Sequence, residues 1–128
     1  TANKLRLLVP SVLRTPAAPH FHVRQHMPTL VWTAPMRYLS ARDEAAFFGW
    51  LQSIPGVIAV KGQGRELLIQ LRSKRLSQVG LRELIAIYSR YNGNLRELAE
   101  FENDANRGWF RDDSAYWFEG VFGDASAV

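Results

Sequence analysis

The stretch that decides the fold is LRELIAIYSRY, residues 81–91. Its apolar residues Leu81, Leu84, Ile85 and Tyr88 recur at steps of three, four and seven, the spacing of one face of an α-helix. Asn92-Gly93 follows and provides the positive φ angle with which many helices end. The sequence therefore predicts an amphipathic helix over 81–91, and we expect the other elements to pack against its apolar face.

The segment before this helix has the pattern of a β-hairpin. Val57–Val60 is continuously apolar, residues 61–64 (KGQG) are typical of a turn, and Arg65–Arg72 alternates between apolar and polar side chains. Because the two glycines of the turn join two strands, and no helix starts there, they do not form a phosphate-binding loop. The stretch 73–80 is expected to be a loop before the helix.

A second helix is predicted over 41–54. Ser40 stands three residues before Asp43, which is the spacing of a side-chain cap at a helix start. Its apolar face holds Phe47, Trp50, Leu51 and Ile54. Upstream, 29–33 (TLVWT) and 36–39 (MRYL) are predicted to be one strand, or two short strands separated at Pro35.

The end of the chain is rich in aromatic residues. A short helix is predicted over 95–102, with Asn94 as its cap and Leu98 and Phe101 pointing inward. Six aromatic residues fall within 108–122, and Ser114 could cap a last helical turn. We expect an α+β fold in which a small antiparallel sheet with a central β-hairpin packs against three to four helices.

Residues 1–26 differ from the rest, because they hold three prolines, all three histidines and no acidic residue. They could be an arm that packs on a partner, a loosely ordered segment, or an extension upstream of a natural start at Met27 or Met36. We expect 1–26 to be a poorly ordered or arm-like N-terminal extension and 27–128 to be one domain. His20 and His22 are close enough to share a metal, but no nearby carboxylate completes a site, so none is expected.

The net charge of +4 hides an uneven distribution. Four bases lie in 1–26, whereas 27–128 holds twelve bases and twelve acids. Within that part, 61–96 has eight bases against two acids, and 97–128 has eight acids against two bases. The folded part is therefore neutral but polar from end to end, which could orient a charged partner or only maintain solubility.

The sequence contains no ordinary catalytic set. The chain has no cysteine, and its histidines are confined to 1–26, so the domain has no thiol nucleophile and no side chain with a pKa near neutrality. Asp112-Asp113 and the acids of 100–104 are neighbours in sequence, which more often cap helices or lie in solvent. We expect no enzyme activity, no cofactor and no metal.

Two kinds of binding remain open. Aromatic residues rimmed by Asp112, Asp113 and Glu119 could form a protein-binding patch, or the aromatic residues could only fill the core. Nucleic acid is the alternative partner, because bases in 72–96 could follow a phosphate backbone. That stripe would consist of Arg72, Lys74, Arg75, Arg82, Arg90 and Arg96.

The order of motifs resembles a group of small bacterial immunity proteins encoded beside polymorphic toxins or contact-dependent growth inhibition toxins. The resemblance covers about 36–123 and does not include 1–26. The motifs are Phe47-Phe48-x-Trp50-Leu51, Ile54-Pro55-Gly56-Val57, Gly62-x-Gly64-x-x-Leu67, Arg82-Glu83-Leu84-Ile85, Arg90-Tyr91, Trp109-Phe110, Tyr116-Trp117 and Val121-Phe122-Gly123.

The resemblance implies a cytoplasmic inhibitor without catalysis that binds one toxin domain and blocks its active site or substrate entry. The acidic end could enter the basic groove of a nuclease toxin, and there it would raise association rate and specificity more than affinity. On that hypothesis the charge comes from Asp104, Asp112, Asp113 and Glu119, with Trp109 and Tyr116 as anchoring residues. The basic stripe could instead meet an acidic toxin, and no membrane partner is expected.

Overall fold

The computed structural model describes residues 27–123. Residues 1–26, including His20, His22 and His26, and residues 124–128 lie outside that part. Every helix within the described range is too short or too polar to span a membrane. The elements are β1 (Thr29–Trp32), α2 (Ala41–Ser53), β2 (Val57–Gln63), β3 (Glu66–Leu71), α3 (Gln78–Arg90), the 3-10 helix η2 (Leu95–Phe101), α4 (Arg107–Phe110) and α5 (Phe118–Phe122).

The three strands form one antiparallel sheet in the order β1-β3-β2, which confirms the predicted α+β fold with a hairpin at its centre. Ile69 of β3 pairs with Leu30 on one side and Val60 on the other. Since side chains alternate along a strand, these three lie on one face, and all three are buried. The predicted hairpin supplies two strands, and β1 adds the third along β3.

The hairpin turn lies later than predicted. Gly62 and Gln63 still belong to β2, with Gln63 paired to Glu66, so the turn occurs at Gly64 and Arg65. Gly64 has a φ of +62°, the left-handed conformation that a two-residue hairpin turn needs. A bulge between Val57 and Ala59 shifts the register at the other end of β2. The predicted strand over 36–39 is wrong, because that stretch has no regular structure.

Helix α2 begins as predicted. The backbone N–H of Asp43 donates to Ser40 Oγ at 3.1 Å, and the Asp43 carboxylate accepts from the backbone N–H of Leu39 at 2.8 Å. Phe47 and Leu51 are fully buried, while Trp50 is half-buried and donates from Nε1 to Glu83 on α3 at 2.7 Å. The cap therefore sets the start of α2, and this bond links it to α3.

Helix α3 starts three residues before the predicted position, and the expected loop over 73–80 is correspondingly shorter. Ser77 explains the difference, because its Oγ accepts from the N–H of Gly80 at 3.0 Å and caps the helix. A Cβ at Gly80 would lie 2.5 Å from the carbonyl oxygen of Pro55, so the first turn of α3 packs directly on the chain between α2 and β2. At the other end Asn92 has a φ of +60°, as the predicted helix stop requires.

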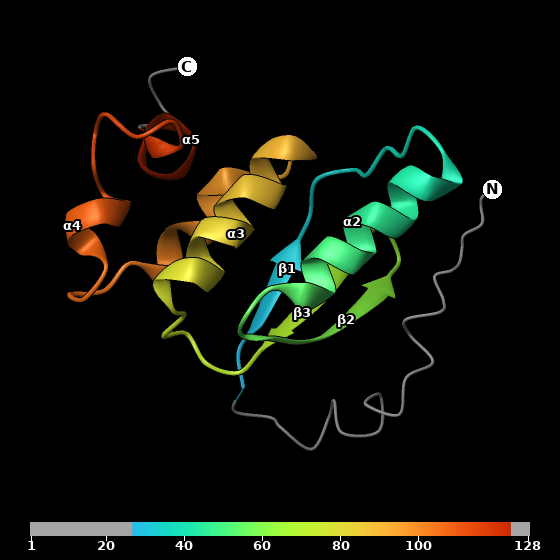
Figure 1. Cartoon of the computed structure of the whole chain (residues 1–128), viewed down its shortest axis with the longest axis horizontal. Helices are drawn as coiled ribbons and strands as arrows, with labels where there is room; N and C mark the ends of the chain where they lie inside the picture. The colour runs from blue at the N-terminus through green and yellow to red at the C-terminus, as the bar shows by residue number, and fades with distance from the viewer. Residues whose placement is uncertain (1–26, 124–128) are drawn as a thin grey trace.

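Helices α2 and α3 lie side by side on one face of the sheet (Figure 1). The apolar face predicted for α3 is buried here, and Tyr88 packs against Trp32 of β1 with ring centroids 4.1 Å apart. The Tyr88 hydroxyl donates to Glu97 of η2 at 3.0 Å, and Thr33 Oγ1 donates to the second oxygen of the same carboxylate. Burial, and then the neighbouring Glu97 carboxylate, raise the pKa of Tyr88.

The C-terminal segment packs beyond α3, away from α2 (Figure 1). Leu98 and Phe101 are buried as predicted, and Asn94 Oδ1 accepts from the N–H of Arg96 at 3.2 Å. The predicted Ser114 cap is wrong. The hydroxyl of Ser114 donates to Asp112, and α5 starts four residues later without a side-chain cap. Helix α5 packs on η2, where a Cβ at Gly120 would lie 2.5 Å from Leu95 Cδ1.

Candidate functional site

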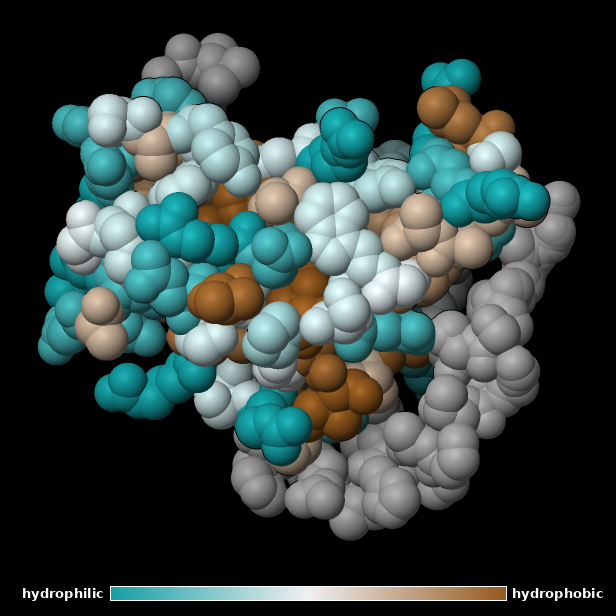
Figure 2. Space-filling model, viewed as in Figure 1, coloured by the Kyte–Doolittle hydropathy of each residue, from teal (hydrophilic) through white to brown (hydrophobic). Residues whose placement is uncertain are grey.

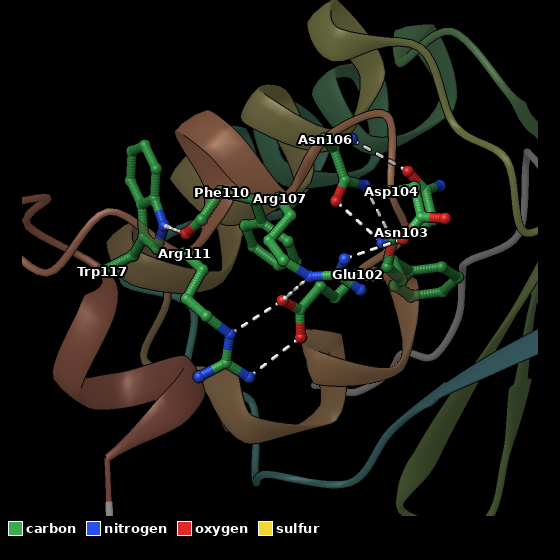
Figure 3. Close-up of polar contacts among 9 residues, drawn as sticks. Glu102, Asn103, Asp104, Asn106, Arg107, Phe110, Arg111 and Trp117 are labelled. Carbon is green, nitrogen blue, oxygen red and sulfur yellow. Dashed lines mark hydrogen bonds and ion pairs between the residues drawn. The ribbon is translucent and has the colours of Figure 1, made fainter.

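The C-terminal segment owes its shape to a pair of asparagines between η2 and α4. The N–H of Asn103 donates to Asn106 Oδ1 and the N–H of Asn106 donates to Asn103 Oδ1, each at 2.9 Å (Figure 3). Asn106 is buried and also donates from Nδ2 to the carbonyl oxygen of Phe101 at 2.8 Å. These bonds turn the chain from η2 into α4 and so fix where Trp109 and Phe110 lie.

The Glu102 carboxylate binds two arginines, Arg107 in α4 and Arg111 directly after the last residue of α4 (Figure 3). Arg111 donates from Nε and Nη2 to the two carboxylate oxygens at 2.7 and 2.9 Å, and Arg107 donates from Nε at 2.9 Å. The hydrogen bonds from Arg111, and then those from Arg107, lower the pKa of Glu102 to about 2 against an opposing effect of burial. Arg107 also pairs with Asp104 at 2.7 Å. This cluster is therefore neutral, with two acids and two bases.

Trp117 joins the aromatic residues of this segment. It is buried, and its Nε1 donates to the carbonyl oxygen of Phe110 at 2.7 Å (Figure 3). Its ring contacts Tyr116 and Trp109 with centroids 5.0 and 6.1 Å apart. Tyr116 lies on the outer side of this group with 67% of its surface exposed. The two anchoring residues predicted from sequence, Trp109 and Tyr116, thus both contact one buried ring.

Arg82 of α3 lies over the same aromatic group. Its guanidinium carbon is 4.5 Å from the centre of the Trp109 ring and 5.6 Å from that of Trp117. The side-chain oxygen of Gln78, in the orientation that satisfies both amide atoms, accepts from Arg82 Nε at 3.1 Å. Val79 lies one turn before Arg82 on α3 and is 61% exposed. We call Val79, Arg82, Trp109 and Tyr116 the arginine–aromatic surface.

The acids predicted for partner binding have different surroundings. Asp104 is paired with Arg107, whereas Asp112 accepts from the backbone N–H and the hydroxyl of Ser114 at 2.9 and 2.8 Å. These two hydrogen bonds lower the pKa of Asp112. Asp113 and Glu119 are exposed. The structure therefore separates Asp104, which belongs to the neutral cluster, from the three acids within 112–119.

The basic stripe is largely free of ion pairs. Lys74 pairs with Glu100 at 3.2 Å. Among residues 27–123, six arginines of 61–96 make no ion pair with a carboxylate. They are Arg65, Arg72, Arg75, Arg82, Arg90 and Arg96. The Lys74–Glu100 pair removes one charge from each side, and the pairs of Glu102 and Asp104 join acids and bases of 97–128. The uneven charge seen in the sequence therefore remains on both sides.

Sequence reasoning missed the role of Arg82. Its position on the polar face of α3 indicated only a member of the basic stripe, and the ring that it covers, Trp109, follows 27 positions later in the chain. No spacing rule links two elements so far apart in sequence. The one available signal was composition, since six aromatic residues fall within 108–122.

The face of the molecule that carries α2 and α3 exposes only small apolar patches, as expected for a surface that contacts a partner over a small area. Figure 2 shows its apolar residues in separate patches among polar ones, without one broad apolar area. Within residues 27–123, no three side chains of His, Cys, Asp or Glu are grouped so that they could hold a metal ion. The arrangement at the arginine–aromatic surface offers a fixed cation, exposed aromatic edges and one apolar side chain, which suits recognition of another molecule.

Comparison with protein-family models, with curated proteins and with solved structures finds no match to this chain.

Proposed function

We propose that this protein is a bacterial immunity protein, which binds a cognate toxin domain in the cytoplasm and blocks its active site or the entry of its substrate. In this proposal the protein acts by binding alone, without catalysis and without a cofactor. The motif order over 36–123 supports the class of protein, and the arginine–aromatic surface supports the mode of action.

The observation that carries the proposal is the position of Arg82 over Trp109 and near Trp117, beside the exposed Tyr116. Tryptophan, tyrosine and arginine are the residues most enriched among those that dominate binding energy at protein interfaces. Here they are held before any partner arrives, because Trp117 is bonded to Phe110 and Arg82 to Gln78. Side chains fixed in advance lose less conformational freedom on binding, which favours a tight complex.

The test is co-expression of the full chain with the toxin domain encoded beside it. We expect the full chain to restore bacterial growth and to elute with the toxin as a one-to-one complex whose mass is measured by light scattering. Arg82→Glu should weaken both effects, whereas Arg96→Glu is the matched control with the same change of charge on η2. Growth restored without any complex would contradict inhibition by binding.

A second candidate function is nucleic-acid binding, which the six arginines without ion pairs favour. A protein that neutralises several phosphates loses affinity steeply as salt rises. Fluorescence anisotropy with labelled DNA and RNA at increasing salt measures this directly. Tight and strongly salt-dependent binding, together with failure to bind the toxin, would favour this second function.

A further inference from the structure

We propose that the arginine–aromatic surface recognises an acidic segment of the partner protein, with a partner carboxylate on Arg82 and an apolar side chain against Val79 and Trp109. This inference rests on the proposed function in one respect only, namely that the partner is a protein. It reverses the charge of the partner expected from the acidic end of the sequence.

The first argument is the distribution of ion pairs. Glu100, Glu102 and Asp104 are each paired within the chain. The acids left without an ion pair around the C-terminal aromatic group are Asp112, Asp113 and Glu119, against six arginines of 61–96 without one in the described range. Paired charges contribute little field at a distance. Within 61–96 the six arginines without an ion pair stand against only two acids, Glu66 and Glu83, so the charge that this segment offers a partner is positive.

The second argument is the geometry of Arg82. Its guanidinium carbon lies over the Trp109 ring, 4.5 Å from the ring centre, which is within the range of a cation–π contact, and Gln78 binds its Nε side. A guanidinium held on an aromatic ring keeps in-plane N–H groups available, and these match the two oxygens of a carboxylate. No carboxylate of residues 27–123 forms an ion pair with it.

The third argument is the apolar contact beside this cation. Val79 is 61% exposed although it is apolar, and it lies on the same side of α3 as Arg82 because the two are three residues apart. Trp109 is half-buried and so retains an exposed edge. A partner segment with an aspartate or glutamate next to an apolar residue can therefore satisfy the charge and cover apolar surface at once.

The test is an NMR titration of the isotope-labelled full chain with a synthetic peptide of glutamates around one central leucine. We expect the indole N–H of Trp109 and the amide N–H groups of Val79 and Arg82 to shift on binding. Arg82→Gln should weaken the affinity about tenfold, as expected for the loss of one charge-assisted pair. Arg96→Gln should bind as the parent does. If Arg82→Gln fails to fold, Val79→Asp at the exposed neighbouring site tests the same contact.

Three outcomes overturn the inference. One is the absence of shifts at Val79, Arg82 and Trp109. A second is stronger binding of the matching lysine peptide around 112–119, which would indicate a basic partner. A third is tighter binding of oligothymidine at the same residues, which would indicate nucleic acid. If the toxin complex forms equally well with Arg82→Gln, only this inference fails; if the peptide binds as expected but the toxin does not, only the immunity function fails.

Discussion

Apolar side chains of two regions, the sheet with α2 and α3 and residues 94–123, form one core, but the second region adds a dense set of hydrogen bonds and ion pairs around Glu102, Asn106 and Trp117. Two buried tryptophans show the difference. Within the described residues Trp32 Nε1 in the sheet has no hydrogen-bond partner, while Trp117 Nε1 is bonded to the carbonyl oxygen of Phe110. The first region therefore depends mainly on packing, whereas we expect the second to need both packing and its polar contacts to present Trp109 and Tyr116.

The largest effect is expected in the first region. Phe47→Ala should lower the free energy of unfolding by about 3–5 kcal/mol, because the ring is fully buried and contacts Trp32 and Tyr91 with centroids 5.3 and 4.8 Å apart. Urea denaturation, monitored by tryptophan fluorescence, measures this change in the free energy of unfolding. Phe47→Leu, which keeps most of the volume, should cost much less, and equal costs for the two variants would contradict the packing argument.

A glycine pair tests how closely α3 approaches the chain after α2. Gly80→Ala should destabilise by up to about 3 kcal/mol, since the added Cβ would lie 2.5 Å from the carbonyl oxygen of Pro55. Gly49 on α2 is the control, because a Cβ there meets no atom within 4 Å. Gly49→Ala should stabilise by about 1 kcal/mol through helix propensity. Thermal unfolding of both variants measures these changes in stability. If Gly80→Ala leaves the stability unchanged, α3 can move away from the chain between α2 and β2.

The two tryptophans offer a direct comparison of the regions. Trp117→Phe and Trp32→Phe remove a similar volume, but only the first leaves a carbonyl oxygen, that of Phe110, without its donor. We expect Trp117→Phe to cost about 1–2 kcal/mol more. Equal losses in chemical denaturation would mean that the C-terminal segment is held by packing alone.

A low pH should weaken the contacts within residues 94–123 in particular. The pKa of Glu102 is about 2 in the folded protein and 4.5 in the free side chain, so its ionised form stabilises the fold fully above pH 4.5 and that contribution is lost as the pH falls toward 2. Glu102→Gln should therefore be less stable than the parent at neutral pH and approach it near the acid limit. Urea titrations of both proteins across this range provide the test, and a difference independent of pH would exclude the Arg107 and Arg111 pairing as its source.

The smallest change in stability is expected at Tyr116, the exposed residue of the aromatic group. Tyr116→Ala should alter the free energy of unfolding by no more than about 0.5 kcal/mol, because the side chain is 67% exposed. The same variant should bind the toxin more weakly, as measured by calorimetry. A loss of stability with unchanged binding would show that Tyr116 belongs to the core.

The same contrast explains what the sequence could predict. The apolar periodicity of α3 and the Ser40 cap act over a few residues, and both were confirmed. The strand alternation holds for Leu67, Ile69 and Leu71, which are buried, but Gln70 on the polar side of the pattern is buried as well. Helix α3 starts before the predicted residue 81 because Ser77 caps it, and Ser114 caps no helix because its hydroxyl donates to Asp112. At the candidate site the aromatic residues could be named, but their arrangement under Arg82 could not, since it depends on elements far apart in the chain.

Hydrogen–deuterium exchange of the full chain, alone and with the toxin domain bound, tests the central claim most directly. If the arginine–aromatic surface binds the partner, amides of 78–83 and 109–117 should gain protection in the complex, while those of 57–71 in the hairpin should change little. Added protection confined to the hairpin, or no added protection anywhere, would contradict the account.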